Sequence, residues 1–347
     1  MDIETINKNN KFVPYLICGY NGSKYIKSIA NESLNQRNLF ADFIKQLLTL
    51  FEFRKRSLIV YSHNLSNFDG VFLMNHLIQF GKVKPNNFHG RLISIKLTLT
   101  TKGHVGKTII FKDSMLLLPK SLRQLCDSFN IVNKKGVFPY LLNDVTYKGK
   151  FPNYNLFTSI SNNEYLNMKV QYSNQIWSFK EEAINYCKLD CLVLHQILVK
   201  FNELIYKEFK VDPINALTLP SLAMRIYKTL YLPNYHSLKQ YSVYQLNGLP
   251  EHNIRQSYTG GAVDEYIPQN KVNEKLYLYD VNALYPSVMK NNPMPIGQPV
   301  AFLGDIRKVD AEAFGFFYCK ITSPDYLEHP ILQRSIKTSD GLRTIAV

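Results

Sequence analysis

The chain has 347 residues, of which 46% are hydrophobic, so it can bury a core and is not a disordered polymer. Its length is enough for about two domains. Lys and Arg number 41 against 27 Asp and Glu, which gives a formal net charge of +14. An excess of this size predicts a polyanionic partner, with nucleic acid the first to test. No apolar run approaches the length of a membrane span, so we expect no membrane contact.

The five cysteines are odd in number, lie far apart and include no C-x-x-C pair. This pattern is typical of free thiols in a reducing compartment. Cys187 and Cys191 are four residues apart and could share one face of a helix. Because no second Cys or His pair accompanies them, the sequence does not predict a zinc site.

The first predicted strand carries two acids. Asp2 and Glu4 are two residues apart, and side chains at that spacing on a strand project from the same face. Two carboxylates so close repel each other unless a cation lies between them. The alternative is an exposed strand end with two solvated acids. Residues 12–20 predict a second strand, and residues 42–53 predict an amphipathic helix.

A polar cluster follows the apolar residues 58–61, which favour a buried strand. After Gly70, apolar side chains recur at helical spacing, which predicts a helix that begins at the turn holding Asp69. An acid at this place usually caps the helix. It becomes a candidate site residue if other acids lie on comparable elements elsewhere in the chain.

Residues 90–114 alternate in polarity around a glycine-containing loop, which predicts a β-hairpin. Its lysines fit a solvated face and a DNA-facing surface equally well: Lys96, Lys102, Lys107 and Lys112. We expect a short helix over residues 120–129 and mostly surface loops over residues 140–178.

Residues 178–205 form the longest predicted helix. Tyr186 and Asp190 are four residues apart and are therefore neighbours on one face of it. Taken alone, they would be a Tyr at the edge of the core and an exposed Asp. Taken with Asp2, Glu4 and Asp69, they complete the set of side chains that a two-metal nuclease requires.

The chemistry of phosphodiester hydrolysis explains this requirement. Negative charge grows on the attacking and leaving oxygens, and two divalent cations can stabilise both. Hard cations such as Mg²⁺ prefer oxygen ligands, so the site needs several carboxylates. A Tyr hydroxyl can then orient the attacking water.

The order D-x-E, N-x-x-x-F-D and Y-x-x-x-D resembles the exonuclease motifs of family B DNA polymerases, in particular the protein-primed branch of phages and linear mitochondrial plasmids. Residues that match these motifs are Asp2, Glu4, Asn64, Phe68, Asp69, Tyr186 and Asp190. The resemblance implies that the four acids bind Mg²⁺, with Mn²⁺ as a substitute. It also implies that Thr5, Asn64 and Phe68 hold a single-stranded primer end, with Phe68 able to stack on a base.

Smaller motifs of the same branch lie between these segments. Ser114 and Met115 resemble its (S/T)-L motif for single-stranded DNA, with Met in place of Leu. Lys135 resembles the Lys of its K-x-x-h motif, which implies that Lys135 assists the exonuclease. Tyr140 falls where the family has a Tyr that contacts DNA.

The second half of the chain resembles the start of a polymerase domain. Tyr258, Gly260 and Gly261 match the family's Y-x-G-G motif, which implies contact with the template; an ordinary hairpin turn is the alternative. Residues 275–280 predict a strand that ends at Asp280, followed by a turn into a helix. The string around Asp280 and Tyr285 resembles motif A, which implies that Asp280 binds metal and nucleotide and that Tyr285 lies under the incoming sugar. Ala283 departs from the pattern, which usually has Ser.

Only 67 residues follow Asp280, and they contain neither a Y-x-D-T-D motif nor a Lys-bearing helix that we can assign. We therefore expect residues 1–208 to form a ribonuclease H-like α/β exonuclease domain. Residues 209–347 are expected to form an incomplete α+β polymerase palm, cut within the palm and trimmed at the start of the chain. Such a chain should be unable to extend a primer by itself.

The sequence thus predicts part of a protein-primed family B DNA polymerase with 3′-to-5′ proofreading, which replicates a linear plasmid or organellar DNA. Its partners would be template-primer DNA, deoxynucleoside triphosphates and a terminal protein. The abundance of Asn, Lys, Ile and Tyr is typical of A+T-rich coding and favours the mitochondrion, with a phage protein in the cytoplasm as the alternative. Two other functions stay open: a stand-alone 3′-to-5′ exonuclease, and an inactive remnant that at most binds nucleic acid by charge.

Overall fold

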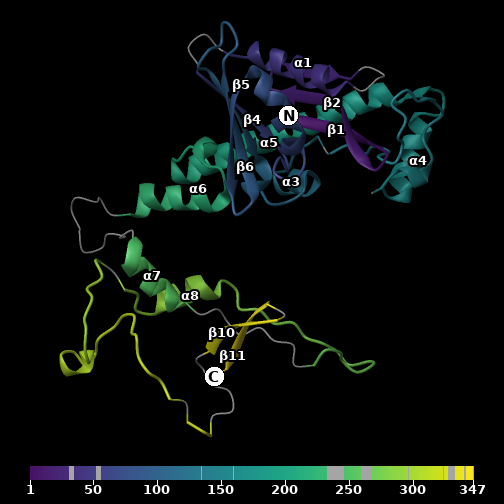
Figure 1. Cartoon of the computed structure of the whole chain (residues 1–347). Coiled ribbons are helices and arrows are strands. Elements are labelled where there is room, and N and C mark those ends of the chain that lie inside the picture. The colour runs from purple at the N-terminus through teal and green to yellow at the C-terminus, as the bar shows by residue number, and fades with distance from the viewer. Residues whose placement is uncertain are drawn as a thin grey trace. The chain divides into compact units, whose positions relative to one another are not determined.

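The computed structural model forms two compact units, residues 1–231 and residues 232–347, drawn in Figure 1. It describes residues 1–30, 35–51, 56–133, 135–158, 160–232, 246–258, 267–295, 297–322, 324–326, 333–339 and 341–346. The boundary expected at residue 208 falls inside the first unit. Val211, Ala216 and Leu222 are buried in one apolar cluster with side chains of the long helix that precedes them, so this segment packs with the first unit.

Two sheets form the centre of the first unit. One is antiparallel, in the order β1 (Asp2–Lys8), β2 (Lys11–Tyr20) and β3 (Tyr25–Ile29). The other has the order β4 (Ser57–Ser62), β7 (Thr108–Asp113), β6 (Arg91–Leu99) and β5 (Gly81–Phe88). In this second sheet β4 and β7 are parallel, and the other pairs are antiparallel. The α-amino group of Met1 donates to the carbonyl oxygen of Tyr61 at 2.6 Å, which holds the start of β1 beside the end of β4.

The helices of the first unit are α1 (Gln36–Leu48), α2 (Asp69–Leu77), α3 (Leu122–Ser128), α4 (Asn162–Gln171), α5 (Phe179–Phe209) and α6 (Leu219–Ile226). Short elements between them are η1 (Ile78–Phe80), η2 (Ser114–Leu116), β8 (Lys148–Gly149), η3 (Tyr154–Leu156), β9 (Trp177–Ser178), η4 (Pro213–Asn215) and the π-helical turn η5 (Tyr227–Tyr231). The predicted hairpin over residues 90–114 is confirmed by the antiparallel pairing of β6 with β7.

One sequence prediction about a helix was wrong in its bounds, and one helix was not predicted. The helix expected over residues 42–53 begins at Gln36 instead, because the side chain of Asn35 accepts a hydrogen bond from the backbone N–H of Asn38 and caps it. Within residues 140–178, where mostly surface loops were expected, the chain forms α4, which is capped by Ser161. Because Tyr165 is the only buried residue of α4, the helix has no apolar face that the sequence pattern could indicate. Tyr165 packs against Phe151 in an aromatic cluster, and this tertiary contact is not visible in local periodicity.

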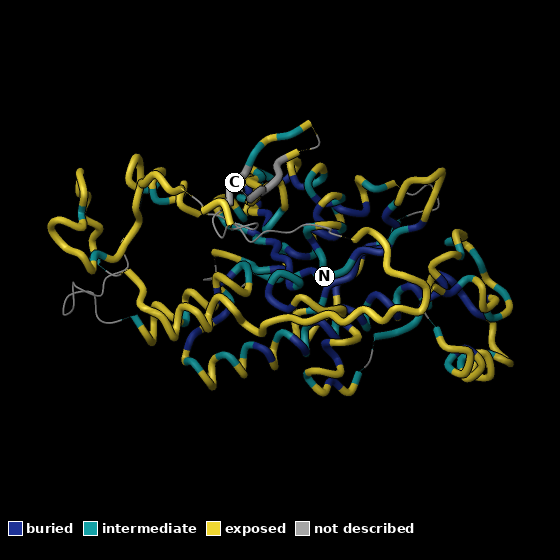
Figure 2. Tube along the Cα trace, turned by 90° about the horizontal axis from the view of Figure 1, so that it is seen from below, coloured by how far each residue is buried: buried dark blue, intermediate teal, exposed yellow. Residues whose placement is uncertain are grey.

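The sheet β1–β2–β3 lies between α1 and α5, as Figure 1 shows. Because side chains of a strand alternate, Ile17 packs on the α1 side, whereas Leu16 and Cys18 pack on the α5 side. Ile3 faces α1 in the same way, so Asp2 and Glu4 face α5. Figure 2 shows buried chain running through this part of the first unit. The register of β1 therefore decides which helix its acids meet.

The second unit contains α7 (Gly248–Gln256), α8 (Leu284–Asn291), η7 (Ile306–Lys308) and the antiparallel pair β10 (Gln333–Thr338) and β11 (Gly341–Ala346). The turn into a helix after Asp280 is confirmed by α8. The strand expected over residues 275–280 is not formed: within the described part of the chain these residues pair with no other strand, and Leu278 is 98% exposed. Among the described helices, none has both the length and the apolar character that a membrane crossing needs.

Candidate metal-binding active site

The acids of β1 meet α5 at the centre of the first unit. Glu4 is buried, and Asp2 is half-buried at the first position of the strand. One carboxylate oxygen of each residue and the sulfur of Cys187 lie within 4.8 Å of one another. The structure therefore brings Asp2 and Glu4 to the same face, and the alternative of two solvated acids does not hold for Glu4.

Asp69 begins α2 and is only 2% exposed. The capping position belongs to Phe68, so Asp69 is not the capping residue that the alternative required. Oδ2 of Asp69 accepts a hydrogen bond of 2.6 Å from the hydroxyl of Ser62, at the end of β4. Its Oδ1 is buried and has no hydrogen-bond partner. Gly70 allows this packing, because a Cβ there would lie 2.7 Å from the carbonyl oxygen of Leu65.

Tyr186 and Asp190 project from α5 and are both buried. Oδ2 of Asp190 lies 3.0 Å from the ammonium of Lys135, whereas its Oδ1 is buried without a hydrogen-bond partner. The hydroxyl of Tyr186 lies 2.5 Å from that of Tyr140. Gly136 lets the segment carrying Lys135 and Tyr140 approach α5, since a Cβ there would be 3.0 Å from the Tyr186 ring. Asp190 is thus not the exposed acid of the alternative interpretation.

These elements enclose one hollow of about 450 Å³, which we call the acidic cavity. It is lined by Asp2, Glu4, Thr5, Phe12, His63, Asn64, Phe68, Asp69, Lys135, Tyr140 and Asp190, among others. The four acids come from β1, α2 and α5, which are far apart in the sequence. Most of the residues expected to act in the first half of the chain therefore share one cavity.

Burial, and then repulsion from neighbouring acids, raises the pKa of Glu4, Asp69 and Asp190. Burial, and then the charges of Asp2 and Asp190, raise the pKa of Glu4 well above its usual value. Burial and the charge of Asp2 raise the pKa of Asp69 to about 7 and that of Asp190 to about 6, although Lys135 partly offsets the effect at Asp190. A cation among these acids would remove the repulsion. The unpartnered oxygens of Asp69 and Asp190, together with the carboxylates of Asp2 and Glu4, fit a hard divalent cation.

The two tyrosines keep their protons. Burial and the charge of Asp190 raise the pKa of Tyr186, and burial and the charge of Glu4 raise that of Tyr140. Both hydroxyls therefore keep their proton at neutral pH. One of them donates to the other across their 2.5 Å contact, which leaves one hydroxyl proton of the pair for another acceptor.

Ser114 and Met115 do not line the acidic cavity. The side chain of Ser114 is fully buried; its hydroxyl donates to the carbonyl oxygen of Ser62 and lies 3.0 Å from Nδ1 of His63. In this conformation the hydroxyl of Ser114 is enclosed by the protein, and contact of Ser114 and Met115 with DNA stays a prediction. The contacts of Ser114 orient His63, which does line the cavity.

Sequence reasoning missed Asp113, at the end of β7. This carboxylate is 1% exposed and accepts hydrogen bonds of 2.9 Å from the backbone N–H groups of Asn64, Ser66 and Met115. It therefore fixes the loop before Asp69, in which Asn64 has a left-handed φ of 73°. The sequence offered one indication of this role, because the segments that form β4 and β7 both end in polar residues. In the structure these residues, Ser62 and Asp113, lie side by side at the ends of two parallel strands.

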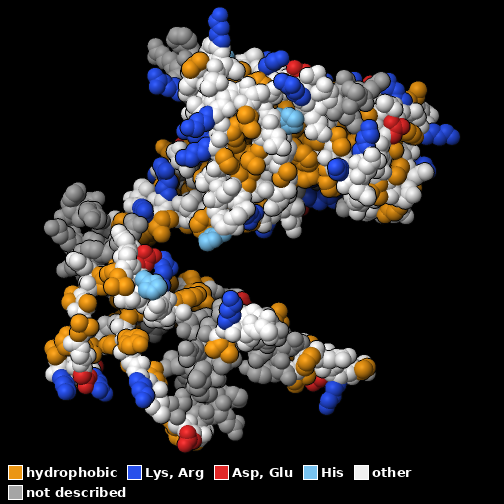
Figure 3. Space-filling view, in the orientation of Figure 1, with side chains coloured by type: hydrophobic (Ala, Val, Ile, Leu, Met, Phe, Trp, Pro, Cys, Tyr) orange, Lys and Arg blue, Asp and Glu red, His pale blue; other side chains and the backbone are white. Residues whose placement is uncertain are grey.

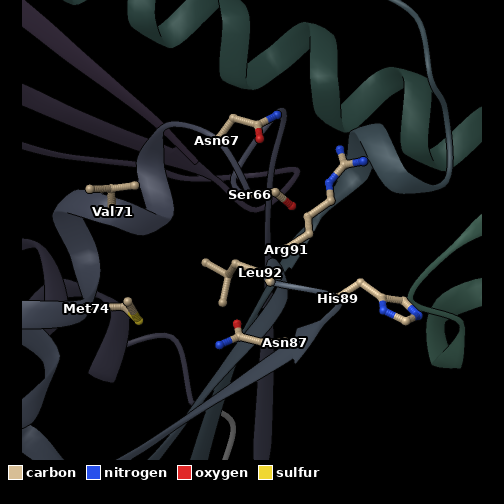
Figure 4. A pocket seen from close by; sticks show the side chains of 9 residues that line it. Ser66, Asn67, Val71, Met74, Asn87, His89, Arg91 and Leu92 are labelled. Atoms are coloured by element: carbon tan, nitrogen blue, oxygen red, sulfur yellow. The ribbon is translucent and has the colours of Figure 1, made fainter. Parts of the chain in front are cut away.

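A second hollow of about 590 Å³ lies beside the loop that precedes Asp69. We call it the hairpin pocket, after the β5–β6 hairpin that forms its other side. It is lined by Ser66 and Asn67 from the loop, by His89 from the turn between β5 and β6, and by Arg91 at the start of β6, as Figure 4 shows. The loop of residues 64–69 thus borders both hollows.

The site residues expected in the second unit are on its surface or outside the described part. Asp280 is exposed, Tyr285 is 72% exposed and Tyr258 is 79% exposed. Gly260 and Gly261 lie outside the described residues. Ala283, which departs from the family pattern, has a left-handed φ of 53° immediately before α8. The exposed positions offer no enclosed site for a nucleotide in this unit by itself.

Comparison with known proteins agrees with the motifs. The family model for DNA polymerase type B, organellar and viral, matches residues 49–347. The chain is 34% identical to a protein named "Probable DNA polymerase" from Ascobolus immersus, in an alignment that covers 100% of this chain and 28% of the relative. It is also 34% identical to a protein of the same name from Neurospora intermedia, with 95% of this chain and 35% of the relative covered. The chain therefore spans about a third or less of the length of these relatives.

Solved structures show the same fold at lower identity. Phi29 DNA polymerase complexed with single-stranded DNA matches with a TM-score of 0.52 and 19% identity, over 88% of this chain and 47% of that chain. Both the sequence and the fold thus agree with the resemblance drawn from the motifs. The chain belongs to the type B DNA polymerases of organelles and viruses.

Proposed function

We propose that the first unit is a ribonuclease H-like exonuclease domain that removes nucleotides from the 3′ end of single-stranded DNA. The observation that carries this proposal is the convergence of Asp2, Glu4, Asp69 and Asp190 on the acidic cavity, with two buried carboxylate oxygens left without a partner. A buried polar atom without a partner is costly, which argues for a ligand at this place.

The four acids would hold Mg²⁺, for which Mn²⁺ could substitute. When bound, the cations supply positive charge for the attacking and leaving oxygens and lower the pKa of water. Lys135 neutralises one oxygen of Asp190 and leaves the other free to bind. Tyr186 and Tyr140 keep their hydroxyl protons and can orient a water molecule beside the phosphodiester.

The rim of the cavity suits a DNA end. The rings of Phe12 and Phe68 lie 6.0 Å apart in an edge-to-face pair, and Phe12 is 62% exposed. Such rings can stack on an unpaired base, whereas Thr5 and Asn64 offer hydrogen bonds to its sugar and phosphate. Lys and Arg outnumber Asp and Glu on the face of the first unit that Figure 3 shows, which favours approach of a polyanion.

For a protein that continues this chain to the length of its relatives, we propose DNA-directed DNA polymerase activity with proofreading. The second unit would open the palm, with Asp280 and Tyr285 at the incoming deoxynucleoside triphosphate and Tyr258, Gly260 and Gly261 at the template. Relatives from fungi and from Bacillus phages support replication of a linear plasmid, organellar or phage genome. Priming by a terminal protein and location in the mitochondrion belong to the same proposal.

A direct test uses residues 1–347 and single-stranded DNA labelled at its 5′ end. With Mg²⁺ we expect a ladder of products that shorten from the 3′ end. Asp69→Asn should lower the rate about a hundredfold or more, since loss of mere supporting residues around a metal costs 10–100-fold. Lys8→Ala, an exposed change on β1 outside the cavity, is the matched control. Equal rates in the Asp69→Asn variant and the unaltered chain would contradict the proposal, whereas salt-sensitive binding without any hydrolysis would indicate an inactive remnant.

A further inference from the structure

Cys187 brings a thiol to the acids of β1. Its side chain is 0% exposed, and its sulfur lies 3.6 Å from the carbonyl oxygen of Asp2. The sulfur and one carboxylate oxygen each of Asp2 and Glu4 lie within 4.8 Å of one another. A group from α5 thus joins two donors from β1.

A buried Cys is often only a small apolar side chain. Cys191, one turn further along α5, is 3% exposed; it contacts the thiol of Cys187 but is not part of the group formed with Asp2 and Glu4. Cys187 differs because its sulfur meets the carboxylates of Asp2 and Glu4. These two acids line the acidic cavity together with Asp69 and Asp190, each of which has a buried oxygen without a hydrogen-bond partner. These unpartnered oxygens are an independent sign that the cavity takes a cation.

The donor set decides which cations it can take. Mg²⁺ gains little from sulfur, whereas Zn²⁺ and Cd²⁺ bind thiolate and carboxylate together. We propose that Asp2, Glu4 and Cys187 form a binding site for a soft or borderline divalent cation such as Zn²⁺ or Cd²⁺. Three protein ligands leave a fourth position for water in a tetrahedral site. On binding, the S–H bond of Cys187 breaks, its proton passes to solvent, a metal–sulfur bond forms, and no group is oxidised or reduced.

Such a site has a consequence for the proposed nuclease, and this consequence rests on that proposed function. Asp2 and Glu4 cannot serve a soft cation and a pair of Mg²⁺ ions at the same time. Zn²⁺ or Cd²⁺ should therefore inhibit Mg²⁺-dependent hydrolysis in competition with Mg²⁺.

The test is a titration of the metal-free chain of 347 residues with Cd²⁺, followed by calorimetry and by the ultraviolet absorption band of cadmium–thiolate bonds. We expect the band in the unaltered chain and in Cys191→Ala, the matched control. Cys187→Ala and Cys187→Ser should lose the band and bind Cd²⁺ at least about tenfold more weakly, since even supporting residues around a metal are worth that much. Thermal unfolding would show that both variants are folded.

A band that persists in folded Cys187→Ala or Cys187→Ser, or no band in the unaltered chain, would overturn the proposal. Binding and nuclease activity are separate measurements. Cadmium–thiolate binding through Cys187 without any Mg²⁺-dependent hydrolysis would support the metal site and contradict the proposed function. If the chain has both the metal site and the Mg²⁺-dependent nuclease activity, Zn²⁺ should inhibit Cys191→Ala more strongly than Cys187→Ser. The Zn²⁺ concentration that halves hydrolysis should be about tenfold lower in Cys191→Ala.

Discussion

The ammonium of Lys135 lies 3.0 Å from Oδ2 of Asp190, and both residues line the acidic cavity. This pair connects a loop with α5 and lowers the cost of a buried carboxylate. The pKa of Lys135 stays above its usual value: burial opposes its charge, but the charge of Asp190 outweighs that effect. Lys135 is therefore charged throughout the physiological range and acts as a fixed cation beside the acids.

Lys135→Ala should raise the pKa of Asp190 above its value of about 6, because burial and the charge of Asp2 would then be opposed only by the hydrogen bond from Tyr186. Since the ionised carboxylate is needed to bind a cation, the acidic limb of the pH–rate profile should move to higher pH. Lys135→Arg keeps the charge and should move it less. The profile of single-stranded DNA hydrolysis between about pH 5 and 9 measures this shift. An acidic limb at the same pH in Lys135→Ala would contradict this electrostatic role.

Without a divalent cation, the first unit should lose stability as the pH rises. Asp69 titrates at about 7 in the folded chain against 3.8 in its usual setting, so between these values the folded state holds more protons than the unfolded state. The free energy of unfolding therefore falls as the pH rises through this window, by an amount of the order of 4 kcal/mol for a shift of this size. Chemical denaturation in EDTA at pH 5 and pH 8 measures the difference.

Asp69→Asn should flatten that dependence, because the group that gains protons on folding is gone. Mg²⁺ should restore stability to the unaltered chain at pH 8 more than at pH 5, since it binds the ionised carboxylates. A chain without added cation that is more stable at pH 8 than at pH 5 would refute the raised pKa that burial and the charge of Asp2 give to Asp69.

Asp113 should affect metal binding indirectly, because it holds the loop before Asp69 but does not line the acidic cavity. Its replacement by Ala leaves the backbone N–H groups of Asn64, Ser66 and Met115 without their acceptor, and each buried group left unpaired costs about 1–3 kcal/mol. We expect a lower free energy of unfolding and a weaker Mg²⁺ affinity, measured by calorimetry. Asp127→Ala, on the exposed side of α3, is the control. An Mg²⁺ affinity equal to that of the control would show that the loop does not position Asp69.

The acids that line the acidic cavity were all named from the sequence, through motif spacing and through strand and helix periodicity, which fixes which side chains of one element share a face. Asp2 and Glu4 are an example, and Tyr186 with Asp190 is another. Asp113 was not identified, because its role depends on a parallel pairing between β4 and β7, which are separated by β5 and β6 in the sequence. The burial of Ser114 depends on the same long-range contact.

Local patterns also failed where an element has no partner to pack against. Residues 275–280 have the alternation of a strand, yet strand formation depends on hydrogen bonds to a neighbouring strand, and the described residues provide none. The start of α1 was misplaced for a different reason. Its first turn is polar, and a capping Asn35 rather than apolar periodicity sets where it begins.

Residues 1–347 by themselves should not extend a primer, because the residues after Asp280 include no second carboxylate motif of the Y-x-D-T-D type. Primer extension with a template-primer, deoxynucleoside triphosphates and Mg²⁺ measures this. Substitution of Asp69 by Asn in the same assay prevents degradation from hiding weak synthesis. Template-dependent incorporation by this chain would contradict the prediction.

Phe68 and Arg91 allow base stacking to be separated from charge in DNA binding. Phe68 borders the acidic cavity beside Phe12, whereas Arg91 is exposed and lines the hairpin pocket. Stacking on an aromatic ring is worth about 1–3 kcal/mol per base, so Phe68→Ala should weaken binding of single-stranded DNA about fivefold or more with little change in salt dependence. Arg91→Ala should instead reduce the slope of log affinity against log salt by about 0.7, the value for one phosphate contact on a single strand. Fluorescence anisotropy over a range of NaCl concentrations distinguishes base stacking by Phe68 from phosphate binding by Arg91. The assignments would be reversed if Phe68→Ala altered the salt slope and Arg91→Ala did not.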